Sequence, residues 1–245
     1  MRLHLSQTVD PPDTKKASFL SLSQPPIFLY HFRVSTLSHF DFCCKRAKLE
    51  LFNQVEKGDG ENKSMVKGTE MHWEFSVPYK SFDRRLLRYR LEQKYGRVFQ
   101  KQVDNIVIRG SYDDLRVLFN RRTQTKWVTL IEVKTTNKPK MWYAEIKAAI
   151  FQLQLYIFLM KDAITGLGWN LHKRHWLEIY SQKDKRLIKR IMVEADPDIE
   201  NKIRYIVRAF QGIAPWRYPE PYVCRICPRK VKDKCPLYQS RKKGI

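Results

Sequence analysis

The stretch from Trp142 to Lys161 constrains the fold of this 245-residue chain more than any other segment. It contains neither glycine nor proline and is apolar over most of its surface, which predicts a helix that is buried on most sides. Its most apolar part carries Gln152 and Gln154 and falls short of the roughly 18 uninterrupted apolar residues of a membrane-spanning helix. We therefore expect this helix to pack against a sheet.

Short runs of β-branched and aromatic residues on both sides of this helix supply the strands of such a sheet. Separated by polar turns, they lie at 103–108, 115–119, 127–133, 174–181 and 187–194. Further helices are expected at 36–53, 68–75, 82–95 and 197–211. The pattern predicts an α/β fold with a mixed central sheet flanked by helices.

The first 33 residues do not share this pattern. They mix serine and lysine with Pro11, Pro12, Pro25 and Pro26, which predicts a poorly ordered extension at 1–33 before a single domain at 34–240. Their apolar pieces are split by polar residues and proline, unlike the continuous apolar region of a signal peptide. We therefore expect a cytoplasmic, reducing environment.

The charge of the chain points to a polyanionic partner. Lysine and arginine number 47 against 25 acidic residues, which gives a formal net charge of +22. The basic residues are spread through the chain rather than gathered on one amphipathic helix, and this favours nucleic acid over a membrane surface. The arginine-rich helix at 82–95 and the basic C-terminal tail are candidates for contacts with phosphates.

Three cysteines near the C-terminus form a C-x2-C-x7-C-P pattern: Cys224, Cys227 and Cys235. Their segment has too little apolar content to fold alone, so a bound metal is expected to stabilise it. Four thiolates are the usual ligands of a tetrahedral zinc ion or an iron-sulfur cluster, and either Cys43 or Cys44 would supply the fourth. The spacing of the cysteines does not distinguish a zinc ion from an iron-sulfur cluster. The alternative is that the three cysteines are buried or free thiols without a metal.

A second group of residues combines carboxylates with a lysine. Asp113 follows one predicted strand, and Glu132-Val133-Lys134 closes the next strong strand. Since residues i and i+2 share a face of a strand, Glu132 and Lys134 would point the same way, with Val133 toward the core. Together with Asp113 they would form a site for Mg²⁺ or Mn²⁺ that activates water near a phosphate. An ordinary surface Glu-Lys pair is the alternative.

Two neighbouring features extend this group. His72, on the short helix at 68–75, could add an imidazole ligand or be a structural histidine. Gln152 and Tyr156 stand at i and i+4 on one face of the long helix. They form either a hydrogen-bonded core pair or a platform for a DNA strand or the lysine.

The order of these residues resembles a known family. From 34 to 236 the chain is similar to the RecB-like nucleases of the PD-(D/E)XK superfamily and, within it, to the CRISPR-associated iron-sulfur exonucleases of the adaptation module. The resemblance rests on Cys44, His72, Asp113, Glu132-x-Lys134, Gln152-x3-Tyr156, Cys224, Cys227 and Cys235. It implies a restriction-endonuclease-like core, metal-dependent cleavage of DNA, and a 4Fe-4S cluster that joins the N- and C-terminal segments.

The resemblance also implies a role for each residue. The divalent cation, Mg²⁺ or Mn²⁺, would be held by His72, Asp113, Glu132 and the Val133 carbonyl. Lys134 would be the catalytic lysine, followed by the motif of Gln152 and Tyr156. The cluster would be held by Cys44, Cys224, Cys227 and Cys235.

Three positions leave alternatives to this assignment. The sequence Cys44-Lys45-Arg46 matches a frequent form of the first cysteine site and favours Cys44 over its neighbour Cys43. Asp113 keeps a Gly-x-x-Asp spacing from Gly110, which favours it over Asp114. Thr136 stands where the family commonly has a glycine after the lysine.

The leading hypothesis is a metal-dependent DNA exonuclease that trims single-stranded ends during CRISPR spacer acquisition. Its expected partners are DNA and CRISPR integrase proteins. The sequence does not distinguish a monomer from a homo-oligomer. One alternative places the same nuclease in recombination, repair or a mobile element. Another is a non-catalytic nucleic-acid-binding module that holds a metal through its cysteines, with Glu132 and Lys134 incidental.

Overall fold

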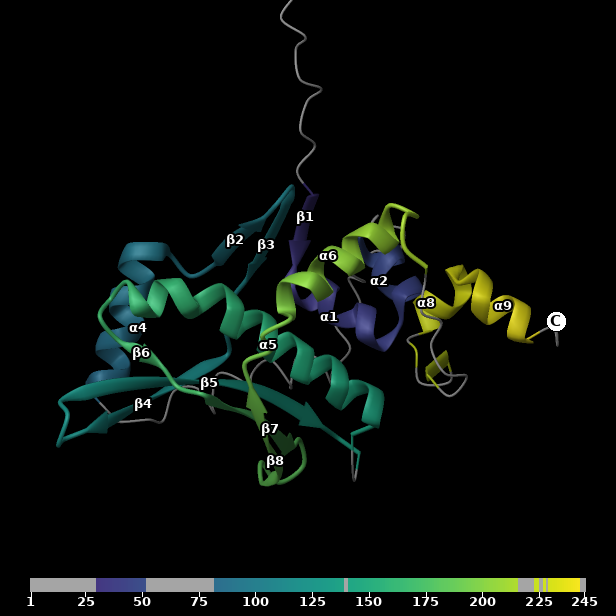
Figure 1. Cartoon of the computed structure of the whole chain (residues 1–245). Helices are drawn as coiled ribbons and strands as arrows, with labels where there is room; N and C mark the ends of the chain where they lie inside the picture. Colours follow the sequence, from purple (N-terminus) through teal and green to yellow (C-terminus); the bar gives the residue numbers. More distant parts are fainter. Residues whose placement is uncertain are drawn as a thin grey trace, which may run out of the picture.

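The computed structural model describes residues 30–51, 82–138, 141–215, 223–224, 227 and 229–242 (Figure 1). Its strands are β1 Tyr30–Arg33, β2 Phe99–Val103, β3 Ile106–Gly110, β4 Asp114–Asn120, β5 Thr125–Thr136, β6 Asn170–Leu171, β7 Arg174–Ser181 and β8 Leu187–Glu194. Its helices are α1 Val34–Phe42, α2 Cys44–Leu51, α4 Phe82–Tyr95, α5 Tyr143–Thr165, α6 Ile199–Phe210, α8 Arg229–Lys234 and α9 Pro236–Lys242.

The larger sheet has the strand order β4-β5-β7-β8, with β6 paired to β5. It is mixed, because β5 runs parallel to β7 while the β4-β5 and β7-β8 pairs are antiparallel. A parallel pair requires a crossover connection, and α5 provides it by running across the sheet (Figure 1). This mixed α/β core fits the restriction-endonuclease-like core that the resemblance implies.

The smaller sheet has the order β1-β3-β2 and places β3 in the centre. The hairpin between β2 and β3 turns at Asp104 and Asn105, where Asp104 takes a φ of 53°. The sequence pattern predicted one strand at 103–108, and this prediction is wrong because it missed the turn. The predicted extension at 1–33 is also too long, since Tyr30–Arg33 form β1 and pair in parallel with β3.

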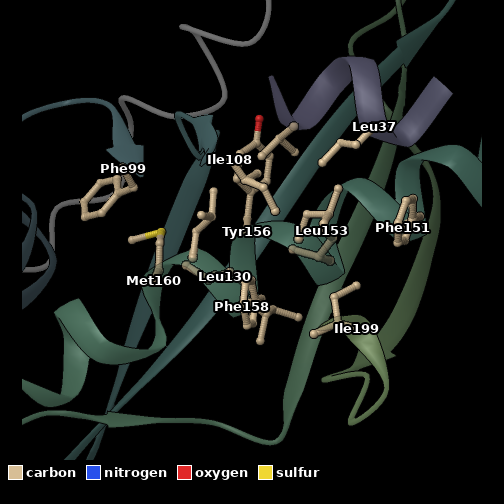
Figure 2. Close-up of a cluster of buried hydrophobic side chains, with 14 of the residues drawn as sticks. Leu37, Phe99, Ile108, Leu130, Phe151, Leu153, Tyr156, Phe158, Met160 and Ile199 are labelled. Carbon is tan, nitrogen blue, oxygen red and sulfur yellow. The ribbon is translucent and has the colours of Figure 1, made fainter. Parts of the chain in front are cut away.

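The main hydrophobic core lies where α5 meets α1 and both sheets (Figure 2). From α5, Leu153 and Tyr156 pack near Leu37 of α1, Ile108 of β3 and Leu130 of β5. The prediction of a buried helix against a sheet is thus confirmed. No helix in the described part of the chain has the length and hydropathy of a membrane span.

The opposite face of the larger sheet carries a buried ion cluster. Leu177 faces the main core, so its neighbour Glu178 points the other way. The Glu178 carboxylate is 3% exposed and accepts hydrogen bonds from Arg116 at 2.9 Å, Arg190 at 3.0 Å and the Tyr180 hydroxyl at 2.7 Å. These interactions link β4, β7 and β8.

The helix predicted at 36–53 is two helices in the structure. The first helix ends before Cys43, whose backbone is extended with a φ of −163° and a ψ of 112°. The second helix, α2, begins at Cys44. The helix predicted at 68–75 lies outside the described residues. The elements predicted at 82–95, 174–181 and 187–194 are α4, β7 and β8, which begin and end at the predicted residues.

Candidate active site

Glu132 is completely buried on β5, at 0% exposure. It continues the alternate positions Val128 and Leu130, whose side chains belong to the main core beneath α5. Val133 is 3% exposed but is not part of that core cluster. Val133 is thus buried, as expected, but on the other face of the strand, and it is the Glu-Lys face that lies toward α5.

Lys134 connects this carboxylate to the long helix. Its Nζ atom lies 2.5 Å from Oε1 of Glu132 and donates a hydrogen bond of 3.0 Å to Oε1 of Gln152. The Gln152 amide in turn donates to the Tyr156 hydroxyl at 3.3 Å. Because Lys134 is 26% exposed, the chain of interactions leads from a fully buried carboxylate to a position that solvent can reach.

Asp113 lies at the other side of Glu132. Its Oδ2 atom accepts a hydrogen bond of 2.9 Å from the Val133 backbone N–H, which fixes it beside the end of β5. Asp114 is 4% exposed and accepts a hydrogen bond from the Leu115 N–H at 2.8 Å. The structure therefore brings Asp113 to Glu132 and places the Asp114 carboxylate at the start of β4.

The electrostatics of the site follow from burial. Loss of hydration raises the pKa of Glu132 to about 8, the Asp113 carboxylate adds to the rise, and Lys134 opposes it. Burial alone would lower the pKa of Lys134, but Glu132 and Asp113 outweigh it and the pKa is raised. Burial, with these carboxylates, also raises the pKa of Tyr156, which keeps its hydroxyl protonated.

The Lys134 ammonium covers Oε1 of the Glu132 carboxylate, whereas Oε2 accepts no hydrogen bond from the described residues. A buried carboxylate is costly unless cations or hydrogen bonds cover its oxygens. Lys134 contacts Oε1 only, so the arrangement suits a hard divalent cation between Glu132 and Asp113. No group of three or more His, Cys, Asp or Glu in the described part of the chain forms a metal site. His72 lies outside that part.

Gly110 has a packing role that local sequence could not reveal. A Cβ atom there would lie 2.8 Å from Cε1 of Tyr156 and 2.8 Å from Cγ2 of Val34. Only glycine lets β3 approach the Tyr156 ring this closely. The partners are 46 and 76 positions away in sequence, so the Gly-x-x-Asp spacing was the only local signal at Gly110.

Four cysteines from both ends of the chain line one small cavity: Cys43, Cys224, Cys227 and Cys235. Cys43 packs with Ala144, Ala148 and Val223. Cys235 packs with Leu49 and Val231, and Cys227 lies against this second cluster. The structure thus brings the junction of α1 and α2 and the segment of the last three cysteines to one cavity.

The choice of Cys44 as the first of these cysteines does not match the structure. Cys44 is 0% exposed and belongs to the main core, where burial raises its pKa to about 12. The break between α1 and α2 turns Cys43 toward the cavity instead. Burial also raises the pKa of Cys43, and neighbouring Cys235 and Cys224 contribute to the rise.

An α/β core with a buried glutamate and a lysine two residues later on its central strand, beside an aspartate, is an arrangement typical of metal-dependent phosphodiester hydrolases. The family model of the PD-(D/E)XK nuclease superfamily matches residues 47–236. The chain belongs to this superfamily and is a nuclease that hydrolyses phosphodiester bonds. Nucleases of this superfamily typically use Mg²⁺ or Mn²⁺.

Among solved structures, that of SSO0001 supports the fold. The structure of SSO0001 matches with a TM-score of 0.50 and 15% sequence identity, over 85% of this chain and 86% of that chain. A protein from Eubacterium rectale described as a "putative exonuclease" matches with a TM-score of 0.41 and 11% identity, over 80% and 85% of the two chains. A search of curated proteins gave no match.

Proposed function

We propose that this nuclease is a metal-dependent DNA exonuclease that acts on single-stranded ends. The observation that supports the proposal is the fully buried Glu132 carboxylate, which lies between Asp113 and Lys134 and has only Lys134 as a counter-charge among the described residues. Asp113, Glu132 and the Val133 carbonyl would hold Mg²⁺ or Mn²⁺, with His72 as a further ligand. The bound ion would supply a more acidic water and offset negative charge on the phosphate.

The side chains around this position orient the attacking water and hold one another in place. The Lys134 ammonium lies where it can orient the attacking water and offset charge on the scissile phosphate. Gln152 holds Lys134 through its amide oxygen, and Tyr156 holds Gln152 through its hydroxyl. The Val133 N–H keeps the Asp113 carboxylate turned toward Glu132.

The test is cleavage of end-labelled single-stranded and double-stranded oligonucleotides with Mg²⁺ or Mn²⁺. Lys134→Ala should reduce kcat by about 100-fold or more, as loss of a group that stabilises transition-state charge does. Gln152→Ala should have a smaller effect in the same direction. Gln154→Ala is the matched control, since Gln154 lies on the same helix and has no side-chain hydrogen bond among the described residues.

Two results would refute the proposal. Equal product patterns for the Lys134→Ala protein and the unchanged chain would show that this site does not cleave DNA. A product that appears first within the strand, rather than as nucleotides released from an end, would exclude an exonuclease and leave the superfamily assignment intact.

We also propose that the four cavity cysteines hold a 4Fe-4S cluster. The support is the donor set: Cys43, Cys224, Cys227 and Cys235 line one cavity, and four cysteine thiolates are what such a cluster takes. Protein purified anaerobically should be brown and contain about four irons. Cys43→Ala should deplete the iron, whereas Cys44→Ala, the adjacent control, should retain it. A colourless zinc protein, or iron lost only from the Cys44 variant, would contradict this assignment.

We place the nuclease in CRISPR spacer acquisition, where it would trim DNA ends for the integrase proteins. The support is the resemblance of its motif order to the iron-sulfur exonucleases of the adaptation module. Integrase genes beside its own gene, and co-purification of their products with this chain, are the expected result. Neighbouring genes for recombination or repair would overturn this placement and favour the alternative role.

A further inference from the structure

A second cavity lies beside the catalytic group, where the smaller sheet meets the start of α1. It has a volume of about 390 Å³, within the range typical of ligand pockets. Its lining includes Arg33 of β1, Arg109 and Gly110 of β3, Ser111, and Tyr156 of α5. None of the described residues that line it is acidic.

The two arginines of this cavity form a pair that has no counter-charge among the described residues. Arg33 and Arg109 are register partners in the parallel β1-β3 pair, so their side chains leave the same face of the sheet from strands about 5 Å apart. Both are exposed, and neither side chain makes an ion pair or hydrogen bond with a described residue. Like charges directly opposite each other destabilise a sheet, and an anion held between them would remove this repulsion.

Tyr156 connects the cavity to the catalytic group. Its ring lines the cavity beside Gly110, and its hydroxyl accepts the hydrogen bond from Gln152, which contacts Lys134. One side chain therefore borders both sites. A nucleic-acid strand with one phosphate at Lys134 could place another phosphate of the same strand in the cavity.

We propose that the cavity of Arg33 and Arg109 binds a phosphate of the strand that is cleaved at the Glu132 and Lys134 site, an inference that rests on the proposed nuclease function. The planar guanidinium groups suit phosphate because each can donate two parallel hydrogen bonds. Ser111 brings a hydroxyl group to the same lining. The phosphate is either the 5′-terminal group of the strand or an internal phosphodiester.

The test compares Arg33→Gln/Arg109→Gln with the control Arg121→Gln/Arg122→Gln. The control removes the same charge from the turn between β4 and β5, away from this cavity. The substrates are one single-stranded oligonucleotide with a 5′-phosphate and the same strand with a 5′-hydroxyl. Loss of charge-assisted hydrogen bonds to the phosphate should raise KM about 10- to 100-fold, with kcat within about twofold.

The two substrates identify the source of the phosphate. A rise in KM for the 5′-phosphorylated strand alone assigns the cavity to the terminal phosphate, and an equal rise for both strands assigns it to an internal phosphodiester. An effect no larger than that of the Arg121/Arg122 control on either strand overturns the proposal. Arg33→Lys/Arg109→Lys, which keeps the charge but loses the planar donors, should recover part of the affinity.

Binding measured by fluorescence anisotropy in EDTA separates this proposal from the proposed function. The measurement needs no cleavage, so the cavity can be tested even if the chain degrades none of the strands offered. The Arg33/Arg109 variant should bind more weakly than the control and lower the slope of log K against log salt by about 0.7 for each phosphate that it no longer neutralises. An unchanged affinity and slope would refute the phosphate site, whatever the cleavage assays show.

Discussion

Replacing Glu132 by glutamine should stabilise the metal-free protein at alkaline pH. Burial raises the pKa of Glu132 from 4.5 to about 8. Between these values the unfolded chain has released a proton that the folded chain still holds, so folding stability falls as pH rises from about 4.5 to 8. Each pH unit is worth about 1.4 kcal/mol, which sets an upper limit of about 5 kcal/mol.

The net gain is smaller than this limit, because Glu132→Gln also removes the carboxylate partner of Lys134. We expect the variant to be more stable than the unchanged chain by about 2–4 kcal/mol at pH 8.5 and nearly equal to it at pH 5. Saturating Mg²⁺ or Mn²⁺ should favour the ionised carboxylate and reduce the pH dependence of the unchanged chain only.

Urea unfolding followed by tryptophan fluorescence, in EDTA and at saturating metal from pH 5 to 8.5, measures both effects. Glu178→Gln is the matched control: Glu178 is equally buried, but Arg116 and Arg190 pair with its carboxylate, so this variant should lose stability throughout the range. The reasoning is refuted if Glu132→Gln is no more stable than the unchanged chain at pH 8.5 in EDTA.

Two further substitutions test features around the site. Gly110→Ala should lower stability by about 1–3 kcal/mol and reduce kcat, because the new Cβ atom would press on Tyr156 and Val34. Urea unfolding measures the stability and steady-state assays measure kcat. Unchanged values of both would contradict the close packing at Gly110. Burial lowers the pKa of His175 to about 4, so stability should fall by up to about 3 kcal/mol as pH drops from 6.5 to 4. His175→Asn, whose amide oxygen can still accept the Leu130 N–H, should lose this acid-dependent fall in urea unfolding, and an identical pH profile would contradict it.

Local patterns predicted the elements whose ends carry their own signals. The helix at 82–95 stops before Gly96, which has a φ of 76°, and β7 and β8 are runs bounded by polar turns. The long helix at 142–161 was predicted from composition alone, and α5 is a few residues longer at its C-terminal end.

Features that depend on distant partners could not be predicted. β1 is four residues long and forms only because β3, about 76 positions later, offers an edge. Val133 is buried as expected, but the burial of Glu132 on the opposite face of β5 could not be predicted, because it depends on the packing of α5 over that face. Cys43 lines the cavity because the chain is extended between α1 and α2. No glycine or proline at this position indicates that the helix is interrupted, so the choice between Cys43 and Cys44 could not be made from the sequence.

The site itself was partly predictable. The i, i+2 spacing correctly placed Glu132 and Lys134 on one face, and the i, i+4 spacing correctly placed Gln152 beside Tyr156. The full burial of Glu132 and the pairing of Arg33 with Arg109 come only from the assembled sheets.

The cysteine cavity has a consequence for how the protein is made. Cys43 and Cys224 are 181 positions apart, whereas the residues from Asp113 to Tyr156 lie within one continuous stretch. During synthesis from the N-terminus, the sheet and α5 leave the ribosome before the segment that carries the last three cysteines. The nuclease core can thus form first, and the cysteine cavity closes only after Cys235 has left the ribosome.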